Sequence, residues 1–331
     1  MYSKTADTVK NRQVSNTRQQ SGASDPYHIL DIEIDDHGAA VCRTGICKTS
    51  PEEIRLFSYN EIPEFLKGNP WVVDGYRAFL PFGLCMKSLF VWSNETLNIW
   101  SHLVGFLLFL VLMLYDNLIA IPRLRGGLTD HVVITLGLLC YQFCMICSTG
   151  FHIFCCHSER ASRRWLQVDM TGVSIGLIGC YLPAVHYAFY CLSIWRDIYM
   201  MIITVLTVST LWFQLHPHFF TSRWFHTRMA VYVGLAAYGI MPSVHWVYLN
   251  GGFSAPVVQM FIPKVTAMYM LGLLAFIFYI SKFPERMFPG VFDYVGSSHQ
   301  CWHVIIAMAM WWWRSTTLHI ARFRLDTSNT C

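Results

Sequence analysis

Charged residues are scarce in this sequence. Asp, Glu, Lys and Arg make up 13% of its 331 residues, whereas hydrophobic residues make up 54%. This ratio excludes a chain that is disordered throughout, and it is far from that of soluble domains, in which about a quarter of the residues are charged. The net charge of +4 is too small, and the basic residues too scattered, for a protein that binds nucleic acid. The composition is typical of a protein that spans a membrane.

The first fifty residues contain no long apolar run. They lack the hydrophobic region of a signal peptide and are rich in Ser, Thr, Asn, Gln and Asp, so we predict a disordered polar tail over 1–50. Apolar residues and turn formers then alternate over 51–93, which we predict to be a cytosolic juxtamembrane segment. This segment could lie on the membrane interface, pack beneath a helical bundle, or form an ordinary ordered linker.

Apolar stretches of about 20 residues, enough helix to cross ~30 Å of hydrocarbon, begin after Asn94. We therefore predict an all-α, polytopic membrane protein with seven transmembrane helices over 94–325 and a short C-terminal tail over 326–331. Pro183 and Pro242 are expected to kink the third and fifth helices, which a bilayer tolerates when neighbouring groups satisfy the backbone. The predicted spans are 98–121, 131–155, 166–190, 196–215, 228–249, 264–281 and 299–321.

Basic residues in the loops predict the orientation, because cytosolic loops are enriched in Lys and Arg. Seven lie in loops on the side of the N-terminal tail and four in loops on the opposite side. When the basic residues near both ends of the chain are added, the counts become nine and seven, which favours a cytosolic N-terminus by a small margin. The seven are Arg160, Arg163, Arg164, Arg223, Arg228, Lys282 and Arg286.

Most cysteines lie in or beside the apolar runs, where Cys behaves as a small buried hydrophobic residue. A disulfide framework would be expected only in a small secreted chain, so we predict mostly free thiols. The cysteines concerned are Cys140, Cys144, Cys147, Cys155, Cys156, Cys180, Cys191 and Cys301.

Ionisable residues within the predicted spans are few, and each is a candidate functional residue. Ser148 and His152 lie at the end of the second span, Asp169 at the start of the third, and His299 and His303 at the start of the seventh. Even-numbered spans end, and odd-numbered spans begin, on the side of the tail, so all five residues are expected at similar depth. Residues four apart share a helix face, which pairs Ser148 with His152 and His299 with His303.

Three histidines with an open fourth position are the ligand set of a catalytic type of zinc site. Neutral imidazole suits this ion, and the open position holds water. We therefore predict Zn²⁺ bound by His152, His299 and His303. The alternative is a hydrogen-bonded network that locks the second, third and seventh helices together without a metal.

Other polar residues of the spans are expected to have structural roles. His186 and His245 have no neighbouring ligand, so we predict hydrogen bonds in the core or at the interface. The polar stripe over 94–102 is expected to cap the first span and to pack against the site. The three tryptophans over 311–313 are expected to belong to the outer aromatic belt.

Three motifs make this sequence resemble the progestin and adipoQ receptor family, which includes the adiponectin receptors. The resemblance covers roughly residues 54–320. It implies zinc on His152, His299 and His303, with Asp169 holding the zinc-bound water and Ser148 nearby, so that Asp169 and Ser148 are the candidate catalytic residues. The motifs are Asn94-Glu95-x-x-Asn98-x-x-Ser101-His102, Ser148-x-x-x-His152 followed by Asp169, and Ser298-His299-x-x-x-His303.

Within that family the sequence is most similar to a Golgi member that tethers Raf kinase at its cytosolic side and dampens ERK signalling. This resemblance implies a multi-pass Golgi membrane protein whose partner is a cytosolic Raf-type kinase. It depends on stretches such as Leu249-Asn250-Gly251-Gly252 and Phe278-Tyr279-Ile280-Ser281-Lys282. The first functional hypothesis is therefore a membrane anchor that uses the tail and the juxtamembrane segment, with zinc as a structural clamp.

The second hypothesis is an intramembrane zinc hydrolase that cleaves a lipid amide, and the adiponectin receptors suggest ceramide as its substrate. Zinc lowers the pKa of water, and Asp169 could act as general base and then general acid. A receptor for adiponectin-type or progestin-type ligands is a further alternative. A G-protein-coupled receptor is disfavoured because Asp-Arg-Tyr and Asn-Pro-x-x-Tyr strings are absent, and retinal binding because the seventh span has no lysine.

Overall fold

The computed structural model describes residues 32–34, 40–42, 54–216 and 218–326, and it separates into two compact units, 1–48 and 49–331. In the first unit, strand β1 (Ile32–Ile34) pairs antiparallel with β2 (Ala40–Cys42), so that Glu33 lies opposite Val41. These strands fall within the tail predicted to be disordered, because the alternation of Ile and Glu suits a strand. The rest of that tail, and residues 327–331 of the C-terminal tail, lie outside the described residues.

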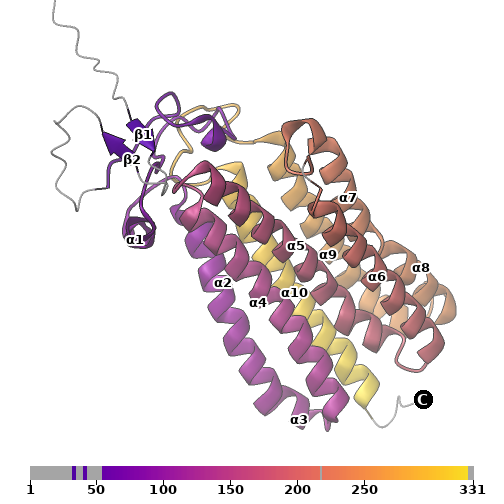
Figure 1. The fold of residues 1–331 in the computed structure, drawn as a ribbon. Helices are drawn as coiled ribbons and strands as arrows, with labels where there is room; N and C mark the ends of the chain where they lie inside the picture. The colour runs from indigo at the N-terminus through magenta and orange to yellow at the C-terminus, as the bar shows by residue number, and fades with distance from the viewer. Residues whose placement is uncertain (1–31, 35–39, 43–53, 217, 327–331) are drawn as a thin grey trace, which may run out of the picture. The chain divides into compact units, whose positions relative to one another are not determined.

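The second unit contains the predicted helical bundle (Figure 1). Six helical segments of the described chain are long and apolar enough to cross a membrane, and α10 is a seventh long helix of 28 residues. The polytopic all-α fold is thus confirmed. The segments are α2 (Thr96–Tyr115) continued by the π-helical turn η3 (Asp116–Ala120) and α3 (Ile121–Arg123), α4 (Leu128–Phe154), α5 (Glu159–Ala188), α6 (Ser193–Gln214), α7 (Phe225–Ala237) with α8 (Ile240–Leu249), α9 (Pro256–Ser281) and α10 (Ser298–Leu325).

Two helices begin well before their predicted starts, by seven and eight residues, whereas the other five begin within three residues of them. Helix α5 begins at Glu159, seven residues before the predicted start at 166, because the Ser158 hydroxyl accepts the Ala161 backbone N–H at 3.3 Å and caps the helix. Helix α9 begins at Pro256 rather than at 264, since proline at the first helical position loses no hydrogen bond. Capping residues outside the apolar run therefore extend both helices.

Proline affects the third and fifth spans differently. The fifth is divided between α7 and α8, because Pro242 has no N–H to donate to the carbonyl of Tyr238 one turn earlier. Pro183 lies within α5, which continues as one helix to Ala188.

The π-helical turn η3 in the first span was not predicted, and the Asp116 side chain at its start is fully buried.

Glycines allow α4 and α5 to approach closely. A Cβ atom on Gly172 would lie 2.9 Å from the Cβ of Cys147, and one on Gly179 would lie 2.5 Å from the Cβ of Cys140. Such small residues at a helix interface are typical of packing in membranes. Close packing of these two helices brings the end of α4 beside the beginning of α5, where the predicted site residues lie.

Most of the described cysteines have free thiols, as predicted. Cys191 is the exception among the predicted residues, because it is disulfide-bonded. It is exposed in the loop between α5 and α6 and does not pack within a helix interface. The free cysteines are Cys85, Cys140, Cys144, Cys147, Cys155, Cys156, Cys180 and Cys301.

The juxtamembrane segment packs against the end of the bundle where α4 ends. It contains the short helices η1 (Glu64–Leu66), α1 (Phe82–Lys87) and η2 (Ser88–Phe90). The other short helix, η4 (Ser222–Trp224), lies elsewhere in the chain, just before α7. Leu80 and Cys85 of the segment form an apolar cluster with Ile99 of α2 and with Ile153 and Cys156 at the end of α4. The segment therefore packs on the bundle and is no free linker.

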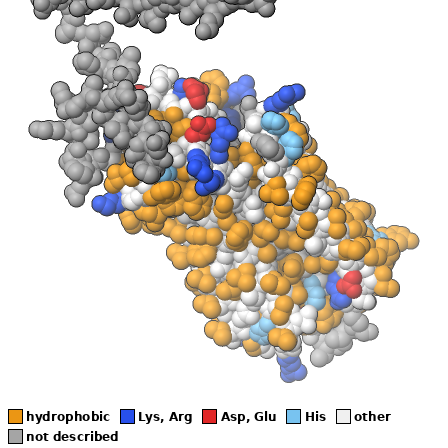
Figure 2. All heavy atoms as spheres, in the orientation of Figure 1, with side chains coloured by type: hydrophobic (Ala, Val, Ile, Leu, Met, Phe, Trp, Pro, Cys, Tyr) orange, Lys and Arg blue, Asp and Glu red, His pale blue; other side chains and the backbone are white. Residues whose placement is uncertain are grey.

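Side-chain types divide the bundle surface into zones. Figure 2 shows hydrophobic side chains over the middle of the bundle, with most charged side chains toward its two ends. This distribution is expected for a bundle whose middle contacts lipid tails and whose ends contact water. The chain is therefore a multi-pass membrane protein.

Candidate metal centre

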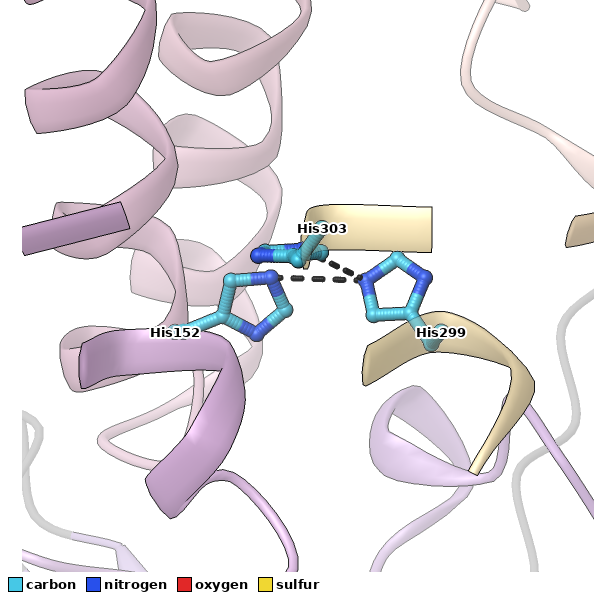
Figure 3. A group of neighbouring side chains, drawn as sticks. All are labelled: His152, His299 and His303. Atoms are coloured by element: carbon cyan, nitrogen blue, oxygen red, sulfur yellow. Dashed lines mark hydrogen bonds between the residues drawn. The ribbon is translucent and has the colours of Figure 1, made fainter. Parts of the chain in front are cut away.

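Three histidines meet where α4 ends and α10 begins. Figure 3 shows the His152 ring extending from α4 toward the rings of His299 and His303, which lie one helical turn apart on α10. The Nε2 atom of His299 lies 3.4 Å from Nε2 of His152 and 3.2 Å from Nε2 of His303. His152 and His303 are each only 2% exposed. The three residues form a group that could hold a metal ion.

The spacing of these nitrogens fits zinc. In tetrahedral sites each imidazole nitrogen lies ~2.0–2.1 Å from the ion, so neighbouring ligand nitrogens are about 3.3 Å apart. Two of the three separations, 3.4 and 3.2 Å, agree with this value, and all three ligand atoms lie within 4.8 Å of one another. The Nε2 atom of His299 contacts Nε2 of both His152 and His303, but it carries at most one proton. Hydrogen bonds alone therefore leave one of these two contacts without a donor. A cation at the centre would resolve this conflict.

Glu95 fixes the orientation of His152. The Nδ1 atom of His152 donates to a Glu95 carboxylate oxygen at 2.7 Å, and the Asn98 side-chain amide donates to the same oxygen at 2.7 Å. Burial opposes the charge of Glu95, but the hydrogen bonds that its carboxylate accepts from His152 and Asn98 lower the pKa of the carboxyl. With its proton on Nδ1, neutral His152 presents a lone pair on Nε2 to the centre, as metal-ligating histidines do.

The role of Glu95 was not predicted from the sequence. The polar stripe over 94–102 was expected to cap the first span and to pack against the site. Packing is observed, since the His102 ring stacks on His303 with 3.9 Å between ring centroids. The position of Glu95 on the tail side, at the depth of the histidines, was the only available signal for its bond to His152.

Asp169 and Ser148 lie beside the three-histidine group without belonging to it. Ser148 lies one turn before His152 on α4 and is 4% exposed, while Asp169 of α5 is 8% exposed. The Asp169 carboxyl interacts electrostatically with His152 and with the Ser148 hydroxyl. The structure thus brings together all five predicted site residues, three as a ligand set and two at its side.

The juxtamembrane segment contacts the ligand-bearing end of α4. The buried Arg77 guanidinium donates to the backbone carbonyl of His152 at 2.5 Å and to the Ser88 hydroxyl at 2.5 Å. The carbonyls of the last turn of a helix have no partner within the helix, and a cation at that end is favourable. Arg77 therefore holds the backbone of a candidate metal ligand in position.

The same segment contacts the beginning of α10. The fully buried Glu285 carboxylate, in the loop between α9 and α10, accepts the Ser298 backbone N–H at 2.7 Å, the Ser298 hydroxyl, and the Asn69 amide at 2.9 Å. Asp293 of this loop accepts the backbone N–H groups of Val73 and Asp74, both at 2.9 Å. Residues 54–93 therefore join the two helices that supply the histidines.

His245 and the tryptophans over 311–313 were also predicted to have structural roles, and the contacts of His245, Trp312 and Trp313 lie away from the centre. His245 hydrogen-bonds through Nδ1 to the Tyr199 hydroxyl at 2.7 Å. Two of the tryptophans predicted for the aromatic belt donate to helix carbonyls within the bundle, Trp312 to Lys264 at 3.0 Å and Trp313 to Cys180 at 2.8 Å. These two indoles therefore connect α10 to α9 and to α5.

Most of this sequence is similar to that of known proteins. Residues 90–313 match the family described as haemolysin-III related, and this stretch includes all five predicted site residues. The chain is 48% identical over 275 residues to progestin and adipoQ receptor family member 3 of Homo sapiens, across 83% of this chain and 88% of that protein. It is 30% identical over 263 residues to heptahelical transmembrane protein 1 of Arabidopsis thaliana (76% and 77%), and 29% identical over 259 residues to the adiponectin receptor protein of Drosophila melanogaster (77% and 57%).

Proposed function

The chain belongs to the haemolysin-III related family, and from this we propose that it is a Golgi membrane anchor for a cytosolic Raf-type kinase. In this proposal, zinc on His152, His299 and His303 clamps the helices that carry the kinase-facing surface. The main support for this proposal is the set of hydrogen bonds that connects residues 54–93 to the end of α4 and to the loop at the beginning of α10. The kinase and the organelle are those implied by the sequence resemblance described above, and the 48% identity to progestin and adipoQ receptor family member 3 supports membership of that family.

A cytosolic position of the metal-centre end is supported by the basic loops. Seven Lys and Arg residues lie in loops on this side and four in loops on the opposite side, and cytosolic loops are enriched in these residues. A membrane-impermeant maleimide should therefore label Arg160→Cys in permeabilised cells with intact Golgi membranes and leave Asp197→Cys unlabelled, whereas the reverse would contradict the orientation.

The anchor is tested with variants that spare the metal centre. Deletion of the whole region up to Trp92 is unsuitable, because it removes the bond from Arg77 to His152. A deletion of 1–48 ends at the boundary between the two compact units, and Arg160→Glu with Arg164→Glu reverses exposed charges at the same end of the bundle.

If the chain is an anchor, one or both of these variants should lose recruitment of Raf kinase to Golgi membranes at unchanged zinc content. Zinc removal should abolish recruitment as well, because it loosens the surface that the clamp holds. The matched control is Arg196→Glu, which reverses a charge at the opposite end and should recruit normally. Normal recruitment by both variants, or by the zinc-free protein, would contradict the proposal.

A second candidate function, hydrolysis of an amide in a membrane lipid, is favoured by the position of Asp169 and Ser148 beside the histidines. Zinc, when bound, supplies a Lewis acid and lowers the pKa of water. The Asp169 carboxylate would accept a proton from the attacking water and donate it to the leaving amine as the C–N bond breaks and the C–O bond forms. The Ser148 hydroxyl would hold the carboxylate in the orientation that this transfer requires.

Asp169→Asn separates the two functions, because it keeps the side-chain size and leaves all three histidines in place. If the chain hydrolyses ceramide, this variant should lose ~10²–10⁴-fold in rate, the usual contribution of a general base. Asp197→Asn is the matched control on an exposed residue. If purified protein with full zinc content cleaves no ceramide, the hydrolase is excluded and the anchor remains. Loss of kinase recruitment by Asp169→Asn at unchanged zinc content would instead contradict the anchor.

A further inference from the structure

A second polar site lies at the end of the bundle opposite the metal centre. A cavity of about 720 Å³ opens there between the end of the first span and helices α9 and α10. His299 and His319 are both on α10, and 20 residues of helix separate the two sites by ~30 Å. The cavity is therefore independent of the three-histidine group.

Basic side chains from three helices surround this cavity. Arg123 comes from α3, Lys264 from α9, and His319 and Arg322 from α10. The hydroxyls of Ser315 and Thr316 add two hydrogen-bond donors, and the lining contains no acidic residue. The side chains that meet here can donate hydrogen bonds from several directions to one anion.

The cations of this cavity have no carboxylate partner among the described residues. Two other basic residues at this end are paired with a carboxylate, since Arg314 binds Asp116 and Arg196 binds Asp197 at 2.9 Å. Neighbouring like charges repel one another, and the repulsion is strongest where the surroundings are partly apolar. An anion in the cavity would offset this repulsion.

The lining also has an apolar part that suits a lipid. Leu124 and Leu318 contribute to the wall, and the Lys264 ammonium nitrogen lies 5.8 Å from the centroid of the Trp312 ring. Trp312 also donates to the Lys264 backbone carbonyl at 3.0 Å, which fixes this part of α9 against α10. Basic pockets between membrane helices bind anionic lipid headgroups at the cytoplasmic face of membranes, and the same charge-assisted contacts would suit an anionic lipid of the opposite leaflet.

We propose that this cavity binds the tetrahedral oxyanion, a phosphate or sulfate ester, of a lipid headgroup that carries a net negative charge and no cationic group of its own. Arg and Lys side chains bind such oxyanions through charge-assisted hydrogen bonds, and the two hydroxyls complete the ring of donors. The acyl chains lie along the apolar wall and the neighbouring bilayer. The lipid thereby joins the first span to α9 and α10 at the end of the bundle that the metal does not reach.

The test uses the full-length protein in nanodiscs. Retained lipid is measured by native mass spectrometry after exchange into phosphatidylcholine that contains phosphatidic acid or sulfatide. The protein should retain one of these anionic lipids in preference to phosphatidylcholine. Lys264→Gln with Arg322→Gln should weaken retention by about tenfold or more, as expected for the loss of two charge-assisted hydrogen bonds.

Two control variants separate recognition from folding. Lys264→Arg with Arg322→Lys keeps both charges and should retain the lipid, while Arg196→Gln removes a paired charge outside the cavity and should also retain it. Equal retention of phosphatidylcholine by the unaltered protein would overturn the proposal. So would full retention of anionic lipid by the Lys264→Gln, Arg322→Gln variant, or failure of the charge-keeping variant to bind.

Inorganic phosphate distinguishes a lipid from a soluble ligand. The headgroup alone should compete weakly, because it lacks contact with the apolar wall. If inorganic phosphate binds as tightly as phosphatidic acid, the lipid assignment is overturned.

Discussion

Helix α10 has different electrostatic surroundings at its two ends. At its beginning, imidazole lone pairs converge, and the charged groups around them, Arg77, Glu95 and Glu285, are all hydrogen-bonded to neighbouring residues. Toward its end, Lys264 and Arg322 line a cavity with no acidic residue. Converging lone pairs suit a cation and a group of basic side chains suits an anion, so the two ends suit ligands of opposite charge. The charged groups at the beginning are held by hydrogen bonds, whereas Lys264 and Arg322 have no carboxylate partner among the described residues.

The largest expected difference between the ends is in zinc content. His303→Ala removes one of three convergent ligands, so bound zinc should fall sharply and the melting temperature in detergent should drop with it. Metal analysis and thermal unfolding measure both effects. The matched control is His102→Phe, which keeps a ring stacked on His303 and should retain zinc. Full zinc occupancy in the His303→Ala protein would refute the metal assignment.

A change at the far end should reduce stability without affecting zinc. Asp116→Asn leaves the Arg314 guanidinium partly buried without its counter-ion, which destabilises proteins by ~3–5 kcal/mol. We therefore expect a lower free energy of unfolding, measured by denaturant titration, at an unchanged zinc content. Asp197→Asn, which breaks an exposed pair, should have little effect. Zinc loss in the Asp116→Asn protein would show that the two ends are coupled.

A smaller effect is expected from the residue that orients His152. Glu95→Gln keeps the size but weakens the hydrogen bond to Nδ1, and loss of such a partner lowers metal affinity by ~10–100-fold. Competition with a zinc chelator of known affinity measures the change. Glu64→Gln, in an exposed pair with Lys67, is the control and should bind zinc as the unaltered protein does. An unchanged affinity after Glu95→Gln would exclude a positioning role.

The smallest effect concerns the surface of the segment over 54–93. Glu61 accepts the Ser58 backbone N–H and hydroxyl, and these bonds and Arg55 lower its pKa against a small opposing effect of burial. A lowered pKa means that the stabilisation is present above the ordinary pKa of a glutamate and is lost as the pH falls through the lowered value. Because Glu61 is exposed, we expect less than ~1 kcal/mol.

Hydrogen exchange of the Ser58 amide, corrected for its intrinsic pH dependence, measures this local effect. The amide should become less protected at low pH and in Glu61→Gln at neutral pH, while zinc content stays constant. Protection that is independent of both changes would contradict the assigned hydrogen bond.

The membrane spans and the meeting of three histidines could be predicted from sequence for one reason. Apolar runs alternate in direction, so residues near the end of the second span and the start of the seventh must share one side of the membrane. This alternation predicted that His152 would lie near His299 and His303 despite their separation in sequence. The edges of spans were less predictable, because caps such as Ser158 lie outside the apolar run.

Contacts between irregular segments could not be predicted in this way. Arg77, Glu285 and Asp293 lie in segments without periodicity, so nothing in the sequence relates their positions in space. The basic cavity likewise combines residues of three helices whose rotation about their axes is set by packing. Glu95 is intermediate, because its depth was predictable while its partner was not.

The bonds of Asn69 to Glu285 and of Val73 to Asp293 also affect the order of events during synthesis. Their members are separated by 216 and 220 residues. At ~5–20 residues per second, the ribosome needs roughly 10–40 s to make the second member after the first. During that time Asn69 and the Val73 amide lack their native partners, and six long helical segments are made before Glu285 appears. The region that borders the metal centre is therefore among the first made and among the last to reach its final structure, and any factor that shields it must act within that interval.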